Sequence, residues 1–286
     1  MSSPPDSPDK QNEAPENTTK KGELGFEDLL PVDEHIEEVS ENGKKVRHRG
    51  VYLLPNLFTT AALFSGFYAI VVSMDGHFES AAIAIFVAMV FDGLDGRVAR
   101  MTNTTSAFGL QYDSLADMVS FGVAPAIVML NWGLQPLDKL AWGASFAFTV
   151  CVGLRLARFN TQAEFTDKRF FIGLASPAGA AVVAAVIWVW HDSVVPYGAS
   201  VLAALMMIFL GFLMVSNLKY NSFKGLDLKG RIPFVWMLAV VLLFAVIASN
   251  PPRMLLILGV IYALSGPVLW VYGLVFRAEP KDKPEQ

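Results

Sequence analysis

The most chemically informative part of the sequence is a group of aspartates that lies between two long apolar runs. Asp92 and Asp95 are three residues apart, and Asp113 and Asp117 are four apart. Four carboxylates at the mouth of a membrane bundle repel one another unless cations lie between them. Oxygen ligands suit hard cations such as Mg²⁺ or Mn²⁺, and room for two ions is typical of sites that react at phosphate. The sequence therefore predicts a site for two divalent metal ions.

Small residues accompany each pair of aspartates. If both segments are helical, the first pair shares a face with Gly96, Ala99 and Arg100, and the second pair shares one with Gly109. A helical hairpin that closes near residues 102–106 would bring the two acidic faces together. The glycines have no side chain, so a neighbouring backbone or a nucleotide can approach them closely.

The spacing of these residues resembles the signature of a known family, the CDP-alcohol phosphotransferases. The matching pattern is Asp92-x2-Asp95-Gly96-x2-Ala99-Arg100-x8-Gly109-x3-Asp113-x3-Asp117, and the sequence departs from the signature at none of these positions. Members of the family are membrane enzymes that move a phosphatidyl-type group from a CDP-linked lipid to an alcohol.

The resemblance implies a role for each signature residue. Metal ions would bridge the diphosphate of the CDP-lipid while an oxygen nucleophile attacks in line and CMP departs. Asp117 would be a metal ligand or the catalytic base that takes the alcohol proton. Arg100 would hold a phosphate, and Gly96 with Ala99 would leave room for the cytidine. The implied metal ligands are Asp92, Asp95, Asp113 and Asp117, and the implied substrate-binding residues of the signature are Gly96, Ala99, Arg100 and Gly109.

Two arginines outside the signature are candidates for binding the acceptor. Arg155 and Arg158 lie three residues apart on one face near the end of a predicted span. They could anchor the span at the membrane interface, or they could form a pocket for a lipid phosphate or for the carboxylate of an amino-acid acceptor. The surrounding LRLARFN, together with FIGLASPA at 171–178 and VSNLKYNSFKG at 215–225, resembles the members of the family that use L-serine. The implied reaction converts CDP-diacylglycerol and L-serine into phosphatidylserine and CMP.

Other functions remain open at this stage. The same chemistry could serve glycerol 3-phosphate, inositol phosphate or choline, because the signature does not distinguish acceptors. A cation transporter could use the acidic cluster as an ion site, but charge is confined to one face and offers no relay across a bilayer. Asn56 and Thr59 could contact nucleotide, or Asn56 could cap a helix that begins near Pro55. Tyr220 belongs to a loop that could close over substrate or simply connect two spans.

Composition predicts an all-α integral membrane protein. Of the 286 residues, 53% are hydrophobic, and the mean hydropathy is +0.44. Apolar runs recur near the length of roughly 20 residues that spans a bilayer. We expect eight transmembrane helices within a domain at 51–276, preceded by a disordered acidic tail with a basic collar at 1–50 and followed by a short tail at 277–286. The eight predicted spans are 53–74, 80–101, 109–130, 140–159, 173–190, 197–217, 232–248 and 254–276.

Basic residues predict the orientation of these spans. If the N-terminus is inside, 20 of the 22 lysines and arginines fall on the same side, and only Lys139 and Arg253 fall on the other. Both termini and the aspartates are then cytoplasmic, in a bacterial inner membrane. The family resemblance also implies a homodimer, and we expect no nucleic-acid partner.

Overall fold

The computed structural model describes residues 38–41, 44–47, 53–102, 107–162, 170–221 and 234–276. Within these ranges the chain is helical apart from four short strands, which confirms the prediction of a polytopic helical protein. The chain divides into two units, Met1–Arg49 and Gly50–Gln286.

The first unit contains a β-hairpin that the sequence did not predict. Strand β1 (Glu38–Glu41) pairs antiparallel with β2 (Lys44–Arg47), with Val39 opposite Val46. The register runs from Glu38 opposite Arg47 to Glu41 opposite Lys44. The expectation of disorder for the rest of the tail falls on residues that lie outside the described ranges.

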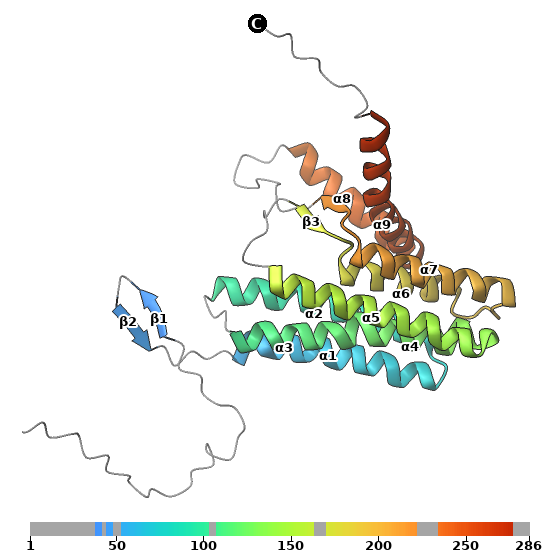
Figure 1. Ribbon diagram of the computed structural model, residues 1–286, viewed down its shortest axis with the longest axis horizontal. Helices are drawn as coiled ribbons and strands as arrows, with labels where there is room; N and C mark the ends of the chain where they lie inside the picture. Colours follow the sequence, from blue (N-terminus) through green and yellow to red (C-terminus); the bar gives the residue numbers. More distant parts are fainter. Residues whose placement is uncertain are drawn as a thin grey trace, which may run out of the picture. The chain divides into compact units, whose positions relative to one another are not determined.

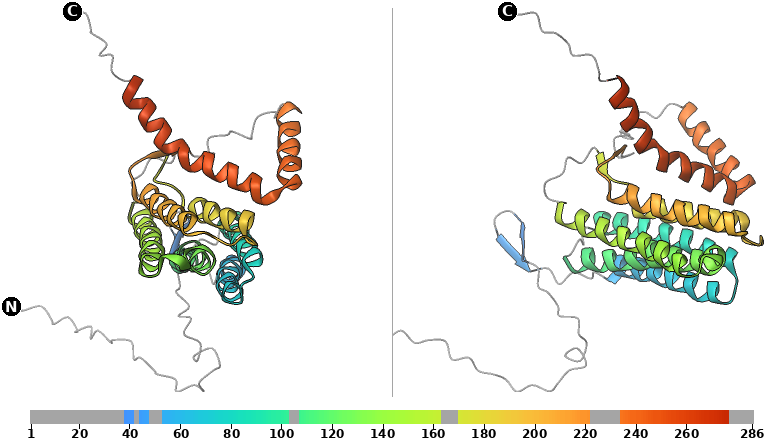
Figure 2. Two further views of the ribbon diagram at one scale, coloured as in Figure 1. Left: turned by 90° about the vertical axis from the view of Figure 1, so that its right-hand side faces the viewer. Right: turned by 45° about the vertical axis from the view of Figure 1, so that its right-hand side comes forward.

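The second unit is a bundle of helices with one short ladder. Figure 2 (left) views α1 to α7 nearly end-on, whereas α8 and α9 are inclined to them. The ladder joins β3 (Phe170–Ile172) to β4 (Lys219–Asn221). The helical elements are α1 (Leu53–Met74), α2 (Phe78–Met101), α3 (Ala107–Asp117), η2 (Met118–Val123), α4 (Ala124–Met129), η3 (Leu130–Leu134), η4 (Gln135–Leu137), α5 (Lys139–Gln162), α6 (Ser176–Trp190), α7 (Tyr197–Val215), α8 (Phe234–Ser249) and α9 (Pro251–Phe276).

These elements correspond to the eight predicted spans, because α3, η2, α4 and η3 follow one another as one continuous rod (Figure 1). Among the described helices, five are long and apolar enough to cross a membrane: Pro55–Met74, Phe108–Leu137, Lys139–Thr161, Tyr197–Val215 and Pro251–Gly273. Helix α6 is shorter, with 15 residues, and α2 carries the charged signature in its last third.

Helix α1 packs against most of the helical elements of the first half of the bundle. A tight turn at Gly76, which has a φ of 81°, reverses the chain so that α2 packs antiparallel along α1. The start of α3 packs against α1 as well. Helix α2 packs against both α1 and α6, and most of its buried residues are alanines, which allow helix backbones to approach closely. As a result, the end of α2 and the start of α3 meet at one end of the bundle.

The third rod changes helical type directly after Asp117. Residues Met118–Val123 form a π-helix, and ordinary α-helix resumes at Ala124. Pro125 explains the wide turn, since it has no N–H to donate to the carbonyl of Phe121 four residues earlier. The hydroxyl of Thr149 on α5 donates to the carbonyl of Gly122 at 3.4 Å and satisfies part of the loosened ladder.

Candidate functional site

The end of α2 and the start of α3 bring three of the four aspartates together. Carboxylate oxygens of Asp92, Asp95 and Asp113 all lie within 4.8 Å of one another. Asp95 is only 6% exposed, whereas Asp92 and Asp113 are half-buried. This is the convergence that helical spacing predicted. The hairpin that joins the two helices includes residues 103–106, which are outside the described ranges.

Asp117 lies one helical turn deeper than Asp113, on the same face of α3. Its side chain is in hydrogen-bonding contact with that of Asp92. Two carboxyl groups at this separation need a proton or a cation between them, because two bare negative charges repel. Asp117 is therefore held beside the trio of carboxylates but is not one of its three members.

Helix α1 supports the cluster from behind. The Thr59 hydroxyl donates to Oδ2 of Asp95 at 2.8 Å and also lies 3.2 Å from the carbonyl of Pro55. Thr59 is 4% exposed, so its hydroxyl is committed to the protein. The structure thus gives Thr59 a role through Asp95, whereas the predicted contact with nucleotide stays a prediction. Asn56 is half-buried, and its carbonyl accepts a hydrogen bond from Thr60.

The opposite side of α2 is open. A Cβ atom added to Gly93 or to Gly96 would meet no protein atom within 4 Å. Packing between helices therefore does not explain either glycine, and free space next to the carboxylates is available to a ligand. Arg100 is exposed, and its Nε donates to the carbonyl of Gly96 at 2.8 Å. Ala99 and Gly109 are half-buried.

The two arginines of α5 are used differently, although their spacing puts them on one face. Arg155 donates from Nη1 to the hydroxyl of Ser176 at 2.6 Å and interacts electrostatically with Asp117 and Asp92. Arg158 donates to the carbonyl of Val215 at 3.2 Å and to Oδ1 of Asn217. Arg155 thus faces the acidic cluster, while Arg158 stabilises the C-terminal end of α7.

Sequence analysis did not single out two of the residues that surround Arg155. Ser176 is completely buried at the first turn of α6, and Tyr262 on α9 interacts electrostatically with the guanidinium. Ser176 lies inside the FIGLASPA stretch, which was a usable signal. Tyr262 comes from a helix more than 100 residues further along the chain, and no local pattern marks it. Nε of Arg155 is buried without a partner among the described residues.

The donor set fits a divalent cation. It consists of carboxylate oxygens from two helices, with a hydroxyl that orients one of them from behind, and hard cations take such oxygen ligands. The net negative charge of the cluster would be costly to maintain at this depth without a counter-charge. Arg155 supplies only one positive charge, so the cluster keeps a net negative charge that bound cations would neutralise.

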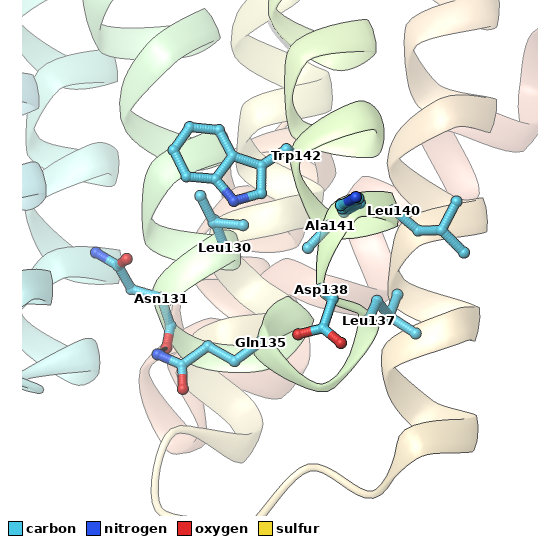
Figure 3. A pocket seen from close by; sticks show the side chains of 9 residues that line it. Leu130, Asn131, Gln135, Leu137, Asp138, Leu140, Ala141 and Trp142 are labelled. Carbon is cyan, nitrogen blue, oxygen red and sulfur yellow. Dashed lines mark hydrogen bonds between the residues drawn. The ribbon is translucent and has the colours of Figure 1, made fainter.

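A separate cavity lies at the other end of the third rod. It has a volume of about 770 Å³, and its lining residues include Asn131, Gln135, Asp138 and Trp142 (Figure 3). The 18 residues from Asp117 to Gln135 correspond to roughly 25 Å of helix. This cavity is too far from the carboxylates to take part in their chemistry.

Comparison with known proteins gives a consistent result. Residues 52–265 match the family described as CDP-alcohol phosphatidyltransferase. A CDP-diacylglycerol–serine O-phosphatidyltransferase of Helicobacter pylori (strain J99) is 33% identical over 236 residues, which are 82% of this chain and 97% of the relative. A protein of the same name from Methanocaldococcus jannaschii is 36% identical over 189 residues, 66% of this chain and 83% of the relative.

A third relative, from Mycobacterium tuberculosis (strain H37Rv), carries the same name and is 40% identical over 148 residues, 48% of this chain and 50% of the relative. The matched range includes all four aspartates, Thr59, both arginines of α5 and Tyr262. The chain belongs to the CDP-alcohol phosphatidyltransferase family, and it has the apolar helices of an integral membrane protein.

Proposed function

We propose that this protein transfers the phosphatidyl group from CDP-diacylglycerol to L-serine and releases CMP. The observation that carries the proposal is a cluster of three carboxylates beside Asp117, together with a half-buried arginine, Arg155, that interacts with Asp117 and Asp92. The relatives named above are serine O-phosphatidyltransferases, which supports serine as the acceptor.

Asp92, Asp95 and Asp113 would hold divalent cations, Mg²⁺ or Mn²⁺, with Asp117 as a further ligand or as the base. When bound, two such ions would neutralise the diphosphate of the donor and stabilise the negative charge on departing CMP. Thr59 keeps the carboxylate of Asp95 in one orientation through its hydrogen bond, so that this ligand does not have to be ordered when the cation binds.

Asp117 is the proposed proton acceptor. The serine hydroxyl oxygen attacks the phosphorus that bears the diacylglycerol, and the bond from that phosphorus to the CMP oxygen breaks. The hydroxyl proton passes to the carboxylate of Asp117. Asp117 contacts Asp92 but is not one of the three clustered carboxylates, which supports a role as base rather than as a main ligand of the cation.

Arg155 is the proposed anchor for the serine carboxylate. Its guanidinium forms a fork suited to a carboxylate, and Ser176 fixes one arm of that fork. Nε is buried and has no partner among the described residues, so it is available as a donor to a small anion. Because Arg155 lies beside Asp117, a serine held there by its carboxylate would bring its hydroxyl toward the base.

The donor would lie on the open side of α2. Gly96 and Ala99 leave space for the cytidine, and Gly109 permits close approach from α3. Arg100 would exchange its contact with the carbonyl of Gly96 for a phosphate. Asn56, half-buried at the start of α1, is a further proposed contact for the nucleotide.

The distribution of basic residues supports an orientation with the active site and both termini in the cytoplasm, in a bacterial inner membrane. We also propose that the protein is a homodimer, by analogy with the family.

An acceptor assay tests the proposed function. Purified protein in mixed micelles with CDP-diacylglycerol and Mg²⁺ or Mn²⁺ receives isotope-labelled serine, glycerol 3-phosphate, inositol phosphate or choline in separate reactions. We expect labelled lipid and stoichiometric CMP with serine alone. Labelled lipid from another alcohol, with serine inert, would overturn the choice of acceptor. Cation flux in liposomes that lack CDP-lipid, without CMP release under any condition, would instead support the transporter.

A further inference from the structure

Tyr220 is a large side chain that is fully buried against α9. It belongs to β4, directly after α7, and is 0% exposed. Its ring lies on the backbone of α9 at Gly266, where an added Cβ would come within 2.4 Å of the ring. A residue of the connecting segment is therefore buried as part of the core, and Gly266 is the position on α9 that makes room for it.

The Tyr220 hydroxyl replaces a hydrogen bond that α9 cannot make for itself. Pro267 lies inside α9 and has no N–H to donate to the carbonyl four residues earlier, which belongs to Ala263. The Tyr220 hydroxyl donates to that carbonyl at 3.0 Å. Burial, with a smaller contribution from Tyr262, raises the pKa of Tyr220 to about 12, so the hydroxyl keeps its proton and remains a donor at neutral pH. Figure 2 (right) shows that α9 changes direction in its C-terminal part, as expected near a proline.

Tyr220 is linked to two residues that contact or face Arg155, namely Tyr262 and Ser176. Its ring lies 5.7 Å from that of Tyr262, which faces the guanidinium from α9. Its strand pairs with β3, with Tyr220 opposite Phe171. The segment after β3 is bound to the end of α7, because Gly173 and Leu174 donate backbone hydrogen bonds to the carbonyls of Leu218 and Leu213. That segment leads directly into Ser176, the hydrogen-bond partner of Arg155.

We infer that Tyr220 is a positioning residue for the acceptor: by closing the gap in the α9 ladder left by Pro267, it holds Tyr262 and Ser176 at the distances that fix the Arg155 guanidinium. This inference rests on the proposed function, in which Arg155 binds the serine carboxylate. Tyr220 touches neither substrate, so it acts on the acceptor through Arg155 and has no part in the chemical step.

The first test is Tyr220→Phe, which keeps the ring against Gly266 and removes only the hydroxyl. We expect the KM for serine to rise at least threefold, with the kcat and the KM for CDP-diacylglycerol within twofold of wild type. Tyr197→Phe is the matched control, because this tyrosine is 62% exposed at the start of α7, the opposite end of that helix. An unchanged serine KM, or an equal change in the KM of both substrates, would overturn the inference.

The second test restores the missing backbone donor. Pro267→Ala introduces an N–H that can bond to the carbonyl of Ala263, so the double variant Tyr220→Phe/Pro267→Ala should recover a serine KM within twofold of the Pro267→Ala variant. This comparison remains available if Tyr220→Phe alone does not fold, since both proteins keep a donor for Ala263. A serine KM that stays raised in the double variant relative to Pro267→Ala would contradict the inference.

Wild-type protein in the same assay separates the two claims. Absence of phosphatidylserine from the wild type counts against the proposed function. Wild-type activity with serine, combined with an unaltered Tyr220→Phe variant, counts against the positioning role alone.

Discussion

Thr59 and Asp95 lie 36 residues apart in the sequence and are joined by a 2.8 Å hydrogen bond from the threonine hydroxyl to Oδ2 of the aspartate. The bond links α1 to the last third of α2, which contains the charged signature residues. It also orients a nearly buried carboxylate before any ligand is present. In a site made of repelling acids, a neutral donor that fixes one of them lowers the cost of assembling the others.

Removal of this hydroxyl should weaken the site without disturbing the fold. Thr59→Val keeps the volume and removes the donor, and we expect a loss of about 10–100-fold in activity or metal affinity. Thr59→Ser keeps the donor and should stay within a few fold of wild type. Thr60→Val is the control, because the Thr60 hydroxyl bonds to the carbonyl of Asn56 and to the hydroxyl of Tyr112 rather than to Asp95. Steady-state rates over a Mn²⁺ titration provide the measurement, and equal rates for the Val and Ser variants at position 59 would remove the supporting role.

The aspartates should divide into two kinds when changed to asparagine. Asp92→Asn and Asp113→Asn are expected to abolish turnover and to weaken the binding of Mn²⁺. Calorimetry or electron spin resonance measures that binding. Asp117→Asn should lose turnover while retaining more of the metal affinity, since Asp117 is not among the three clustered carboxylates. Asp75→Asn, in the turn between α1 and α2, is the control. Near-normal activity of either of the first two variants would remove the metal assignment.

Gly96 offers a test that separates binding from stability. An added methyl group meets no protein atom within 4 Å, so Gly96→Ala should not lower the thermal midpoint. If the cytidine occupies that space, the KM for CDP-diacylglycerol should rise several-fold, with the serine KM unchanged. Gly143→Ala on α5, which is also unobstructed, should alter neither KM. Full activity of Gly96→Ala at low donor concentration would indicate that the nucleotide lies elsewhere.

The arginines of α5 should respond unequally. Arg155→Lys keeps the charge and loses the fork, and we expect the serine KM to rise about tenfold or more, with little change in the donor KM. Arg158→Ala should mainly reduce stability, because its guanidinium bonds to the end of α7. Kinetics with both substrates varied, together with unfolding curves, distinguish these effects. A serine KM that responds only to Arg158→Ala would reverse the assignment.

Close packing of α1 against the π-helical segment should make Gly66 intolerant of a side chain. An added Cβ would lie 2.6 Å from Oγ and 2.7 Å from Cα of Ser120, and relief of such a contact typically costs about 1–3 kcal/mol. Gly66→Ala is expected to unfold at lower temperature or lower denaturant concentration. Gly143→Ala serves again as control and should stabilise its helix by up to about 1 kcal/mol. Equal stability of the two variants would mean that α1 can move away from Ser120 at no cost.

The helices and the acidic cluster could be predicted because their signals are local. Runs of apolar residues define the spans, and the spacing of Asp92, Asp95 and Asp113 determines helix faces within a few turns. The π-helix was not predicted, since it depends on how Pro125 is accommodated between neighbouring helices. The ladder of β3 and β4 was missed because each strand has three residues and lies beside apolar helices that dominate the pattern.

The remaining features of the site could not be predicted, because they depend on contacts between residues that are far apart in the sequence. Arg155 and Arg158 are the same type of residue and lie on the same face of α5. Only their hydrogen-bond partners, on α6 and α7 respectively, distinguish them. Thr59 was named in the sequence only as a possible nucleotide contact, and its hydrogen bond to Asp95 could not be predicted because the two residues lie 36 positions apart. Tyr220 and Pro267 are 47 positions apart, and neither one indicates the other until α9 is placed against the connecting segment.

The π-helical segment after Asp117 changes the direction in which side chains face along a single rod, so that the two ends of the rod can face different neighbours. Upstream of it the rod turns its acids toward α2, and downstream it turns Ala124, Ala126 and Val128 into the apolar interior. A protein shortened by one residue in that segment could still form an unbroken helix and still span the bilayer. It would have to rotate one end by about 100° relative to the other, so either catalysis or the buried interface would lose its alignment. Length in this rod is therefore under a constraint that hydropathy alone does not reveal.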